Sequence, residues 1–370
     1  NGVIQSTNDG SINGMIIKYS AEGEVEWAKG IGGSDQDYIN TVAESSDGGI
    51  IAGGYFSSSS IDLGNGVSLS NKGDEDGMII KYSSSGECEW AKGIGGDSND
   101  RITSLAETSD GRIIAGGYFG SSIDIGNGIV LSSKGFYNGM IIKYSAEGEV
   151  EWAKVIGGSS SDQINSVAET SDGGYVAGGY FDSSSIDLGN GVSLSNSFAG
   201  MIIKYSGLGE CEWARRIEIG SNANITSVTE TSNGGYLAGG YFGDNVDLGN
   251  GVSLSNKGSS DGMIIKFEKT ELPNPTTIQA KGIGGSRDDQ IAAVAETSDG
   301  GYVAGGYFES DSINLGNGVI LSNKGDKDGM IIKYNSSGEC EWAKAIGGSD
   351  DDTIIIGGSY DDTITSVAET

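Results

Sequence analysis

SVAETSDGGYVAGGYF, residues 166–181, is one of five nearly identical stretches in this chain. The others begin at Thr41, Ser104, Ser227 and Ala293, and a truncated copy, SVAET, begins at Ser366. The motif GMIIK recurs with the same period of about 62 residues, and its methionines are Met15, Met78, Met140, Met201, Met263 and Met330. A period of this size is typical of solenoids, propellers and arrays.

Each repeat contains four segments that we interpret as strands and name a, b, c and d. In one repeat, strands a (166–170) and b (175–181) flank SDGG, an Asp-Gly hairpin signal. Strand c, GMIIKYS at 200–206, has three apolar residues in a row, which suits a sheet covered on both faces. Strand d contains tryptophan in five of the six repeats. The pattern predicts an all-β fold, a β-propeller of four-stranded blades.

The two ends of the chain suggest how the ring closes. Residues 1–33 match the second half of a repeat, and the chain ends on a strand-a sequence. We predict six blades in a single domain over residues 1–370, with a closing blade built from 1–33 and 353–370. TIIIGGSY, which begins at Thr353, would supply its strand b. The chain opens in mid-repeat. The alternative to six blades is therefore a processed or partial chain whose full ring is larger.

Two stretches also resemble a known family. DGMIIKYSSSGECEWAKGIGG, residues 76–96, and DRITSLAETSDGRIIAGGYF, residues 100–119, look like the bacterial β-propeller repeat often labelled SBBP. The resemblance implies a propeller at the surface of bacteria or secreted by them, and it implies no catalytic residues. The chain departs from that pattern in a long loop, IDLGNGVSLSN at 61–71, which reads as loop and turn.

Composition excludes several functions. The chain has no histidine, which removes Ser-His-Asp catalysis and His-ligated zinc or haem. Its net charge of −30 disfavours nucleic acid and anionic membranes as partners, and no apolar run is long enough to span a bilayer. Cys88, Cys211 and Cys340 share one repeat position, so we expect them to be reduced and far apart.

Strand a carries a repeated glutamate. In propellers this strand lines the central channel, so six carboxylates could form a ring that binds a cation such as Ca²⁺. The alternative is solvated or hydrogen-bonded glutamates, and apart from this possible Ca²⁺ we expect no cofactor. The candidate ligands are Glu44, Glu107, Glu169, Glu230, Glu296 and Glu369.

The residues around the start of strand c change freely between repeats whose strands are nearly identical. The loops between strands d and a vary in the same way, and both sets of loops should emerge on one face. We therefore expect a binding face there. Its candidate residues are Asp74, Glu75, Asp76, Phe136, Tyr137, Asn138, Phe198, Asp261, Asp326, Lys327 and Asp328.

Two functions remain. The first is a non-enzymatic extracellular or cell-surface scaffold that contacts a protein, a glycan or a neighbouring subunit through this loop face. The second is a propeller-type glycosidase or lyase with Asp and Glu at the channel mouth. A catalytic site needs carboxylates in different environments, whereas these recur with the repeat, and we therefore favour the first.

Overall fold

The computed structural model describes residues 11–196, 198–217, 223–268, 275–348, 355–356 and 363–364. In these ranges every regular element is a β-strand, and most strands form four-stranded antiparallel sheets in the order a, b, c, d. The chain divides into two compact units, residues 1–164 and 165–370. Repeated sheets of this kind confirm the all-β class and are consistent with a β-propeller. The six-bladed ring and the single domain stay predictions.

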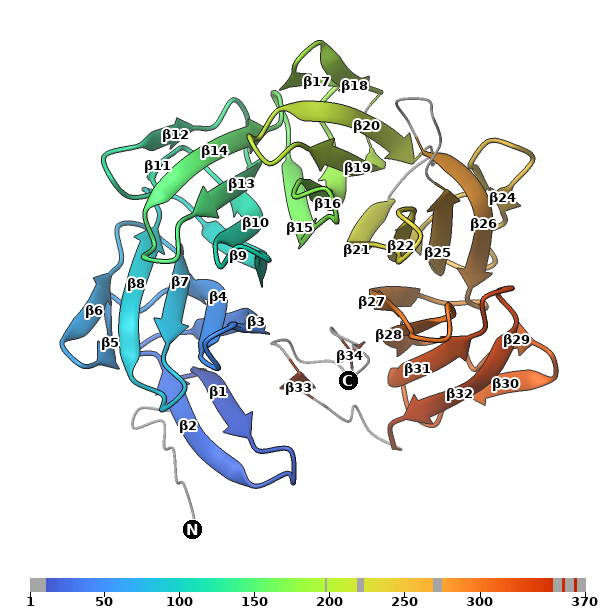
Figure 1. Ribbon diagram of the computed structural model, residues 1–370. Helices are drawn as coiled ribbons and strands as arrows, with labels where there is room; N and C mark the ends of the chain where they lie inside the picture. The colour runs from blue at the N-terminus through green and yellow to red at the C-terminus, as the bar shows by residue number, and fades with distance from the viewer. Residues whose placement is uncertain are drawn as a thin grey trace. The chain divides into compact units, whose positions relative to one another are not determined.

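The first unit contains two complete sheets and one hairpin (Figure 1). The hairpin consists of β1 (Gly14–Tyr19) and β2 (Val25–Ile31). The first complete sheet consists of β3 (Asp37–Glu44), β4 (Ile50–Phe56), β7 (Asp76–Tyr82) and β8 (Cys88–Ile94). The second consists of β9 (Asp100–Glu107), β10 (Ile113–Phe119), β13 (Asn138–Tyr144) and β14 (Val150–Ile156).

The second unit contains three complete sheets. The first, which starts at the unit boundary, consists of β15 (Asp162–Glu169), β16 (Tyr175–Phe181), β19 (Ala199–Tyr205) and β20 (Cys211–Ile217). The next consists of β21 (Asn224–Glu230), β22 (Tyr236–Phe242), β25 (Asp261–Glu268) and β26 (Thr276–Ile283). The last consists of β27 (Asp289–Glu296), β28 (Tyr302–Phe308), β31 (Asp328–Tyr334) and β32 (Cys340–Ile346).

Most of the predicted closing blade lies outside the described residues, which exclude 1–10, 349–354 and 365–370. Its strands c and d are present as the β1–β2 hairpin. Near the C-terminus, β33 (Ile355–Ile356) pairs in parallel with β34 (Thr363–Ile364). A blade that combines both ends therefore stays a prediction.

The long b–c connection contains a second hairpin, where the sequence predicted a loop. In the first unit, β5 (Ser60–Gly64) pairs with β6 (Val67–Ser70) across a turn at Asn65 and Gly66, whose φ angles are 52° and 77°. Asn-Gly is the usual sequence of such tight hairpin turns. Asn65 Nδ2 donates to Cys88 O at 3.1 Å, and this hydrogen bond ties the hairpin to strand d.

The same hairpin recurs in the other repeats. Covering the outermost strand in this way protects a sheet edge from pairing with another chain. The remaining hairpins are β11 (Ser122–Asp124) with β12 (Val130–Ser132), β17 (Ser185–Gly189) with β18 (Val192–Ser195), β23 (Val246–Asp247) with β24 (Ser253–Leu254), and β29 (Ser312–Gly316) with β30 (Val319–Ser322).

Glycines of strand b receive the strand-a side chains of the following sheet in the same unit. A Cβ on Gly53 would lie 2.8 Å from both Ile102 Cγ2 and Leu105 Cδ2. In the second unit, a Cβ on Gly239 would lie 2.7 Å from Val294 Cγ1. The first glycine of the repeated Gly-Gly therefore allows close approach between neighbouring sheets, whereas a Cβ on the second, as at Gly54, would collide with Tyr38 O in strand a of its own sheet.

The tryptophans of strand d lie elsewhere. Trp27 stacks on Gly86, in the c–d turn of the next sheet, and donates Nε1–H to Ser84 O at 3.0 Å. Gln279 replaces tryptophan in one repeat and keeps this hydrogen bond, donating to Ser337 O at 2.8 Å. These hydrogen bonds thus link strand d to the c–d turn of the neighbouring sheet.

The three cysteines are free and buried, so the prediction of reduced cysteines is confirmed. Burial raises the pKa of Cys88 to about 11, which keeps its thiol protonated at neutral pH. Among the described residues, no helix has the length and apolar character needed to cross a membrane.

Candidate binding surface

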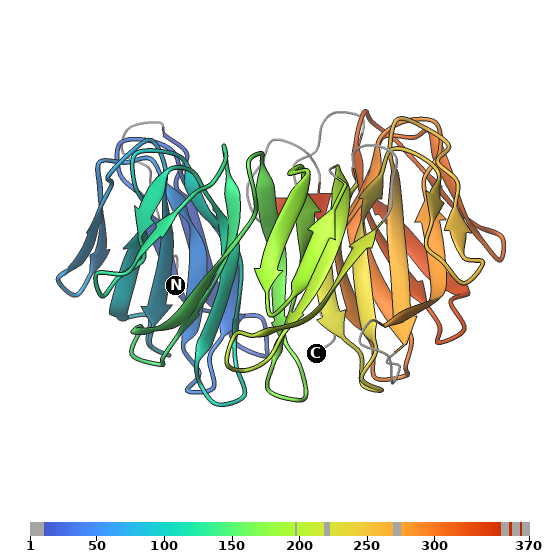
Figure 2. The same ribbon diagram turned by 90° about the horizontal axis from the view of Figure 1, so that it is seen from above.

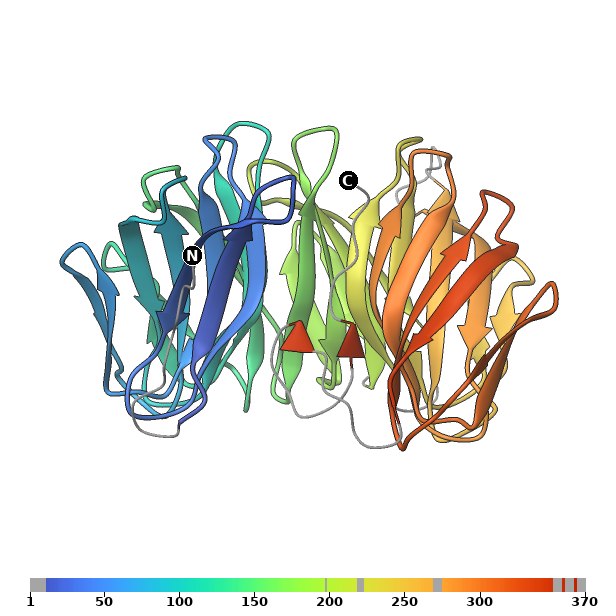
Figure 3. The same cartoon turned by 90° about the horizontal axis from the view of Figure 1, so that it is seen from below.

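The b–c loops and the d–a loops lie side by side in both units. In the first unit Asp100 N donates to Glu75 O at 2.7 Å, and in the second Asp289 N donates to Ser260 O at 3.0 Å. Figures 2 and 3 show the strands of each unit running between two edges where the turns gather. We call the edge formed by the b–c and d–a loops the loop face of each unit. The variable positions thus come together as the sequence predicted.

Two phenylalanines of the predicted set stand out from this face. Phe136 of the first unit is 81% exposed, and Phe198 of the second is 57% exposed. Phe198 also has a φ of 62°, in the left-handed region that bulky residues seldom adopt. An exposed aromatic ring held on a strained backbone is a feature that marks interaction sites more often than packing.

Four predicted residues are not on the surface. Asp76, Asn138, Asp261 and Asp328 are fully buried at the start of strand c, so they contribute to packing beneath the loop face and cannot touch a ligand there. The sequence placed them on the surface because they adjoin the exposed Asp74 and Asp326. In each case strand c, whose residues are largely buried on both faces, begins at this residue, which is the last of the variable segment.

The first unit gathers tyrosines around one arginine. The rings of Tyr38 and Tyr55 stack with centroids 4.9 Å apart, and Arg101 Cζ lies 4.0 Å from the centre of the Tyr55 ring. On the other side, Arg101 lies 6.0 Å from the ring of Tyr118, which meets Tyr137 edge-on at 5.4 Å. These five residues form a continuous tyrosine–arginine cluster at the loop face.

An acidic residue fixes the arginine. Arg101 Nε donates to Glu75 Oε2 at 2.6 Å, and both side chains are partly exposed. Burial raises the pKa of Tyr55 to about 12, so this phenol is neutral at physiological pH. Glu75 and Tyr137 belonged to the predicted set, whereas Tyr38, Tyr55, Arg101 and Tyr118 did not. The signal for Tyr38 and Arg101 was present in the sequence, because the second residue of β3, β9, β15 and β27 varies between repeats, whereas Tyr55 and Tyr118 belong to the constant motif of strand b.

The second unit carries a smaller cation–aromatic pair. Lys327 Nζ lies 4.0 Å from the centre of the Tyr307 ring and 3.3 Å from Glu309 Oε1. Where the first unit has Tyr38 and Arg101, strands β21 and β27 have Asn224 and Gln290. Lys327 was predicted from the sequence, and its ring partner was not.

The strand-a glutamates bind the turn of the preceding sheet. Glu107 Oε2 accepts a hydrogen bond from Ser46 N at 2.6 Å, and Glu296 Oε2 accepts one from Ser232 N at 2.6 Å. Glu230 accepts from Ser171 N in the same way. Glu369 lies outside the described residues. No group of three or more Cys, Asp or Glu side chains that could hold a metal ion occurs in the described part of the chain.

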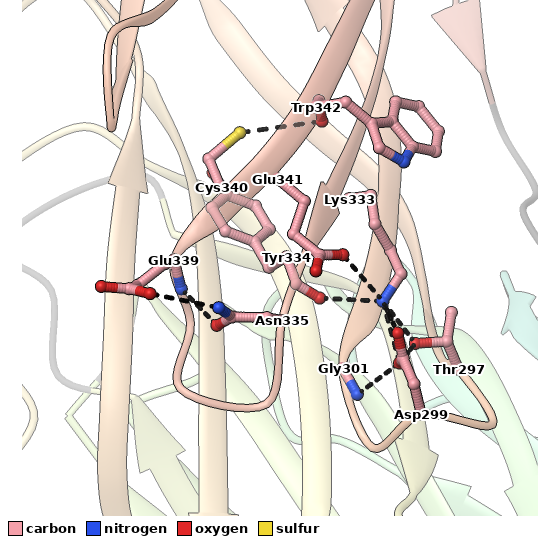
Figure 4. A network of polar contacts seen from close by, with 10 residues as sticks. All are labelled: Thr297, Asp299, Gly301, Lys333, Tyr334, Asn335, Glu339, Cys340, Glu341 and Trp342. Atoms are coloured by element: carbon pink, nitrogen blue, oxygen red, sulfur yellow. Dashed lines mark hydrogen bonds and ion pairs between the residues drawn. The ribbon is translucent and has the colours of Figure 1, made fainter.

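Strand c contributes a lysine that the repeat pattern did not single out. Lys333 Nζ donates to Thr297 Oγ1 and to both carboxylate oxygens of Asp299, each at 2.9 Å, as Figure 4 shows. Gly301 N also donates to Asp299 Oδ1 at 2.9 Å. The contacts from Lys333, Thr297 and Gly301 hold the pKa of Asp299 well below its usual range.

The same ion pair recurs in other repeats of both units. Lys81 Nζ donates to Asp47 at 2.9 Å, and the almost fully buried Lys204 donates to Asp172 at 3.0 Å. The aspartate of the SDGG turn and the lysine of GMIIK are therefore partners. Each network joins the a–b turn to strand c and recurs with the repeat.

Comparisons with known proteins give distant relatives. No family model matches the chain. It is 20% identical over 354 residues to the regulatory protein FlaEY of Caulobacter vibrioides, which covers 90% of this chain and 36% of that protein. It is 28% identical over 149 residues to the uncharacterized WD repeat-containing protein L264 of Acanthamoeba polyphaga mimivirus, covering 37% of this chain and 11% of that protein. The chain thus spans well under two thirds of either relative.

Solved structures give similarly weak likenesses. A protein of unknown function from Bacteroides caccae aligns with a TM-score of 0.44 and 11% identity over 90% of this chain and 94% of its own. The WD40 domain of Neurospora crassa Pan2 aligns with a TM-score of 0.42 and 10% identity over 84% of this chain and 64% of its own. The resemblance to the bacterial propeller repeat stays a prediction.

Proposed function

We propose that the chain is a non-enzymatic binding module, a six-bladed β-propeller closed by residues from both ends, which holds a protein or glycan ligand on its loop face. The observation that supports this most strongly is the tyrosine–arginine cluster of the first unit. Tyrosine and arginine are the residues most enriched at the energetic centres of protein interfaces. Stacked rings also suit the apolar face of a sugar.

A protein ligand is favoured over a glycan. Tyr55 is buried, the other three rings of the cluster are partly buried, and a guanidinium joins them, so they offer edges and a charge more than a flat open platform. With a net charge of −30, the chain also attracts positively charged partners over long distances. The location at the bacterial surface or outside the cell is part of the proposal and is supported by the resemblance of the repeats.

The absence of enzymatic activity is also proposed. Carboxylates with specific contacts in the described residues recur at equivalent repeat positions, as with Asp47, Asp172 and Asp299 in the a–b turns. A glycosidase needs two carboxylates of different character facing one bond. Incubation of a glycan array with the protein, followed by analysis of released sugars, should detect no turnover, and any product that depends on intact carboxylates would overturn this part.

Site-specific photo-crosslinking tests the binding face. A benzophenone amino acid replaces Phe136 or Phe198 on the loop face, and as the matched control it replaces Leu208, which is 82% exposed in a c–d turn. We expect cells or extracts of the source to yield the same crosslinked partner at Phe136 and Phe198 and none at Leu208. Equal crosslinking at all three positions, or none at any, would contradict the proposed face.

A further inference from the structure

Beneath the loop face, two buried positions face each other in the described repeats. One is the residue before the Gly-Met of strand c, and the other begins or directly precedes the next strand a; of these residues only Asn13 is partly exposed. The two residues of each repeat are Asn13 with Asp37, Asp76 with Asp100, Asn138 with Asp162, Ala199 with Ala223, and Asp261 with Asp289. Both positions are polar in four of these repeats and both are alanine in one, which indicates that the two side chains depend on each other.

The Asn–Asp pair shows what the pocket requires. Asn138 Oδ1 accepts a hydrogen bond from Lys134 N at 2.7 Å. Its Nδ2 donates to Tyr137 O at 2.8 Å, to Gly158 O at 3.2 Å and to Asp162 Oδ2 at 3.3 Å. The amide nitrogen therefore occupies a point surrounded by three acceptor oxygens, and a hydrogen-bond donor belongs there.

In two of these repeats an aspartate stands at this point. Asp76 Oδ2 accepts from Lys72 N at 3.0 Å, as Asn138 Oδ1 does from Lys134 N, so Asp76 Oδ1 takes the place of the amide nitrogen. This oxygen is buried and has no hydrogen-bond partner. In the second unit Asp261 repeats the arrangement, with Oδ2 accepting from Lys257 N at 3.0 Å and Oδ1 buried without a partner.

The facing aspartates supply no donor. Asp100 accepts from Gly96 N at 2.9 Å and from Gly120 N at 3.0 Å, so both of its oxygens already act as acceptors. In the second unit, a Cβ on Gly284 would collide with Asp261 Oδ1 and lie 2.9 Å from Asp289 Oδ2. The two carboxyl groups therefore lie next to the same glycine. Two adjacent buried carboxylates cannot both stay ionised without a positive charge between them.

We propose that each of these two pairs holds one proton. Asp76 Oδ1 takes a proton from solvent as the protein folds and donates it to Asp100 Oδ2, and Asp261 does the same toward Asp289. The O–H group replaces the amide N–H of Asn138, and each pair then has a charge of −1, equal to that of the Asn–Asp pair. The described residues thus contain two such pairs, one in each unit; Asp328 Oδ1 is also buried without a partner, but the position that would face it lies outside the described residues.

A metal ion fits the same pocket less well. Judged by the contacts of Asn138, the pocket offers about four oxygens, whereas Ca²⁺ takes six to eight. The pocket is fully buried, so water is poorly placed to complete the coordination. At the equivalent position the amide N–H groups of Asn138 donate to the surrounding oxygens, so a donor hydrogen satisfies the backbone around it.

The electrostatics of the first pair agree with this assignment. Burial raises the pKa of Asp100 to about 7 and also raises the pKa of Asp76. The charged groups that face the pair are Lys72, which lowers the pKa of Asp76, and Glu75, which raises that of Asp100 and is itself paired with Arg101.

The second pair behaves alike. Burial raises the pKa of Asp261 to about 6 and also raises the pKa of Asp289. The charged groups nearby are Lys257, which lowers the pKa of Asp261, and Asp288, which contacts Ser260 at 3.4 Å. In both units, therefore, burial is the main cause and the neighbouring charges partly oppose one another.

The sign of the pH dependence follows. A free aspartate has a pKa of about 3.9, so between this value and the higher folded pKa the native state holds protons that the unfolded chain has lost. Stability should therefore fall as pH rises from about 4 to about 7. Each pair should change the unfolding equilibrium constant by up to about tenfold per pH unit within that window.

The test converts both pairs to the Asn–Asp form. In D76N/D261N the amide supplies the donor at every pH, so the variant should fold as the Asn138 repeat does. We expect the wild-type urea midpoint to fall between pH 5 and pH 8, the variant's midpoint to fall less steeply, and the variant to be the more stable at pH 8. The control D74N/D326N removes two exposed charges next to the same loops and should keep the wild-type slope.

Two further measurements separate a proton from an ion. Infrared spectra at pH 5 should contain the carbonyl band of a protonated carboxylic acid, and this band should weaken in D76N/D261N. Parallel wild-type and variant pH profiles would overturn the proposal. A metal cation in the pair would also overturn the proposal. It would raise the wild-type urea midpoint at pH 8 when Ca²⁺ is added, or when NaCl replaces choline chloride, and it would leave the midpoint of D76N/D261N unchanged.

Discussion

The loop faces of the two units are built on nearly the same strands and differ in a few side chains. Both units place a tyrosine near the end of strand b, namely Tyr55 and Tyr118 in the first and Tyr180, Tyr241 and Tyr307 in the second. Only the first unit adds Arg101, which lies against two tyrosine rings and bonds Glu75. In such a repeat the constant residues build the sheets, and the substitutions between copies indicate where function resides.

The largest expected effect tests whether the two units unfold together. Phe119 in the first unit and Phe308 in the second are equivalent and fully buried. F119A and F308A should each lower stability by about 3–5 kcal/mol, because each leaves a cavity in a packed core. Since we predict a single domain, calorimetry should show one transition that both variants shift. Two transitions, each sensitive to one variant only, would contradict the single domain, and the exposed F136A is the neutral control.

The next effect concerns ligand binding at the first unit. R101Q gives β9 the residue that β27 has at Gln290, which makes the two loop faces more alike. We expect the affinity for the crosslinked partner to fall at least about tenfold, because a central arginine commonly contributes about 2 kcal/mol or more. Surface plasmon resonance measures this. R112Q, at an arginine in an a–b turn, is the matched control and should bind normally; an equal loss in both variants would show a general charge effect.

A smaller effect is expected at the lysine–aspartate pairs. Asp172 bonds the buried Lys204, whereas the equivalent turn residue in the next repeat is Asn233. D172N copies that repeat and should cost about 1 kcal/mol at pH 7, a value kept small because the carboxylate is half exposed. Burial raises the pKa of Asp172, but contacts from Thr170, Lys204 and Gly174 lower it further, to about 2.

The pH dependence gives the control for D172N. Because the folded pKa lies below the unfolded value of about 3.9, the contribution is present above about pH 4 and is lost as the pH falls toward 2. The wild type and D172N should therefore converge in acid urea titrations. A constant difference at all pH values would mean that packing, not the charge, stabilises the turn.

The sequence predicts features that depend on residues close together in the chain better than features that depend on distant residues. Strands and the SDGG turn are local, and the repeat displays each of them five times, so fold class followed directly. Contacts between residues far apart in the chain were not readable in this way: Trp27 binds a turn of the next sheet, and Lys81 of strand c bonds Asp47 in the a–b turn. The buried aspartates were misplaced for the same reason, because adjacency to exposed residues in the chain says little about the partner in space.

The smallest expected effect is that of calcium. The predicted ring of glutamates would need free carboxylates, but Glu107, Glu230 and Glu296 each accept a backbone N–H from the preceding turn. A cation would have to compete with these charge-assisted hydrogen bonds. We therefore expect melting curves in EDTA and in millimolar Ca²⁺ to coincide. A ligand at a hundredfold excess over its Kd adds about 2.7 kcal/mol, which calorimetry would readily detect. A rise of that size in wild type that E107Q/E230Q/E296Q abolishes would restore the glutamate ring as a calcium site.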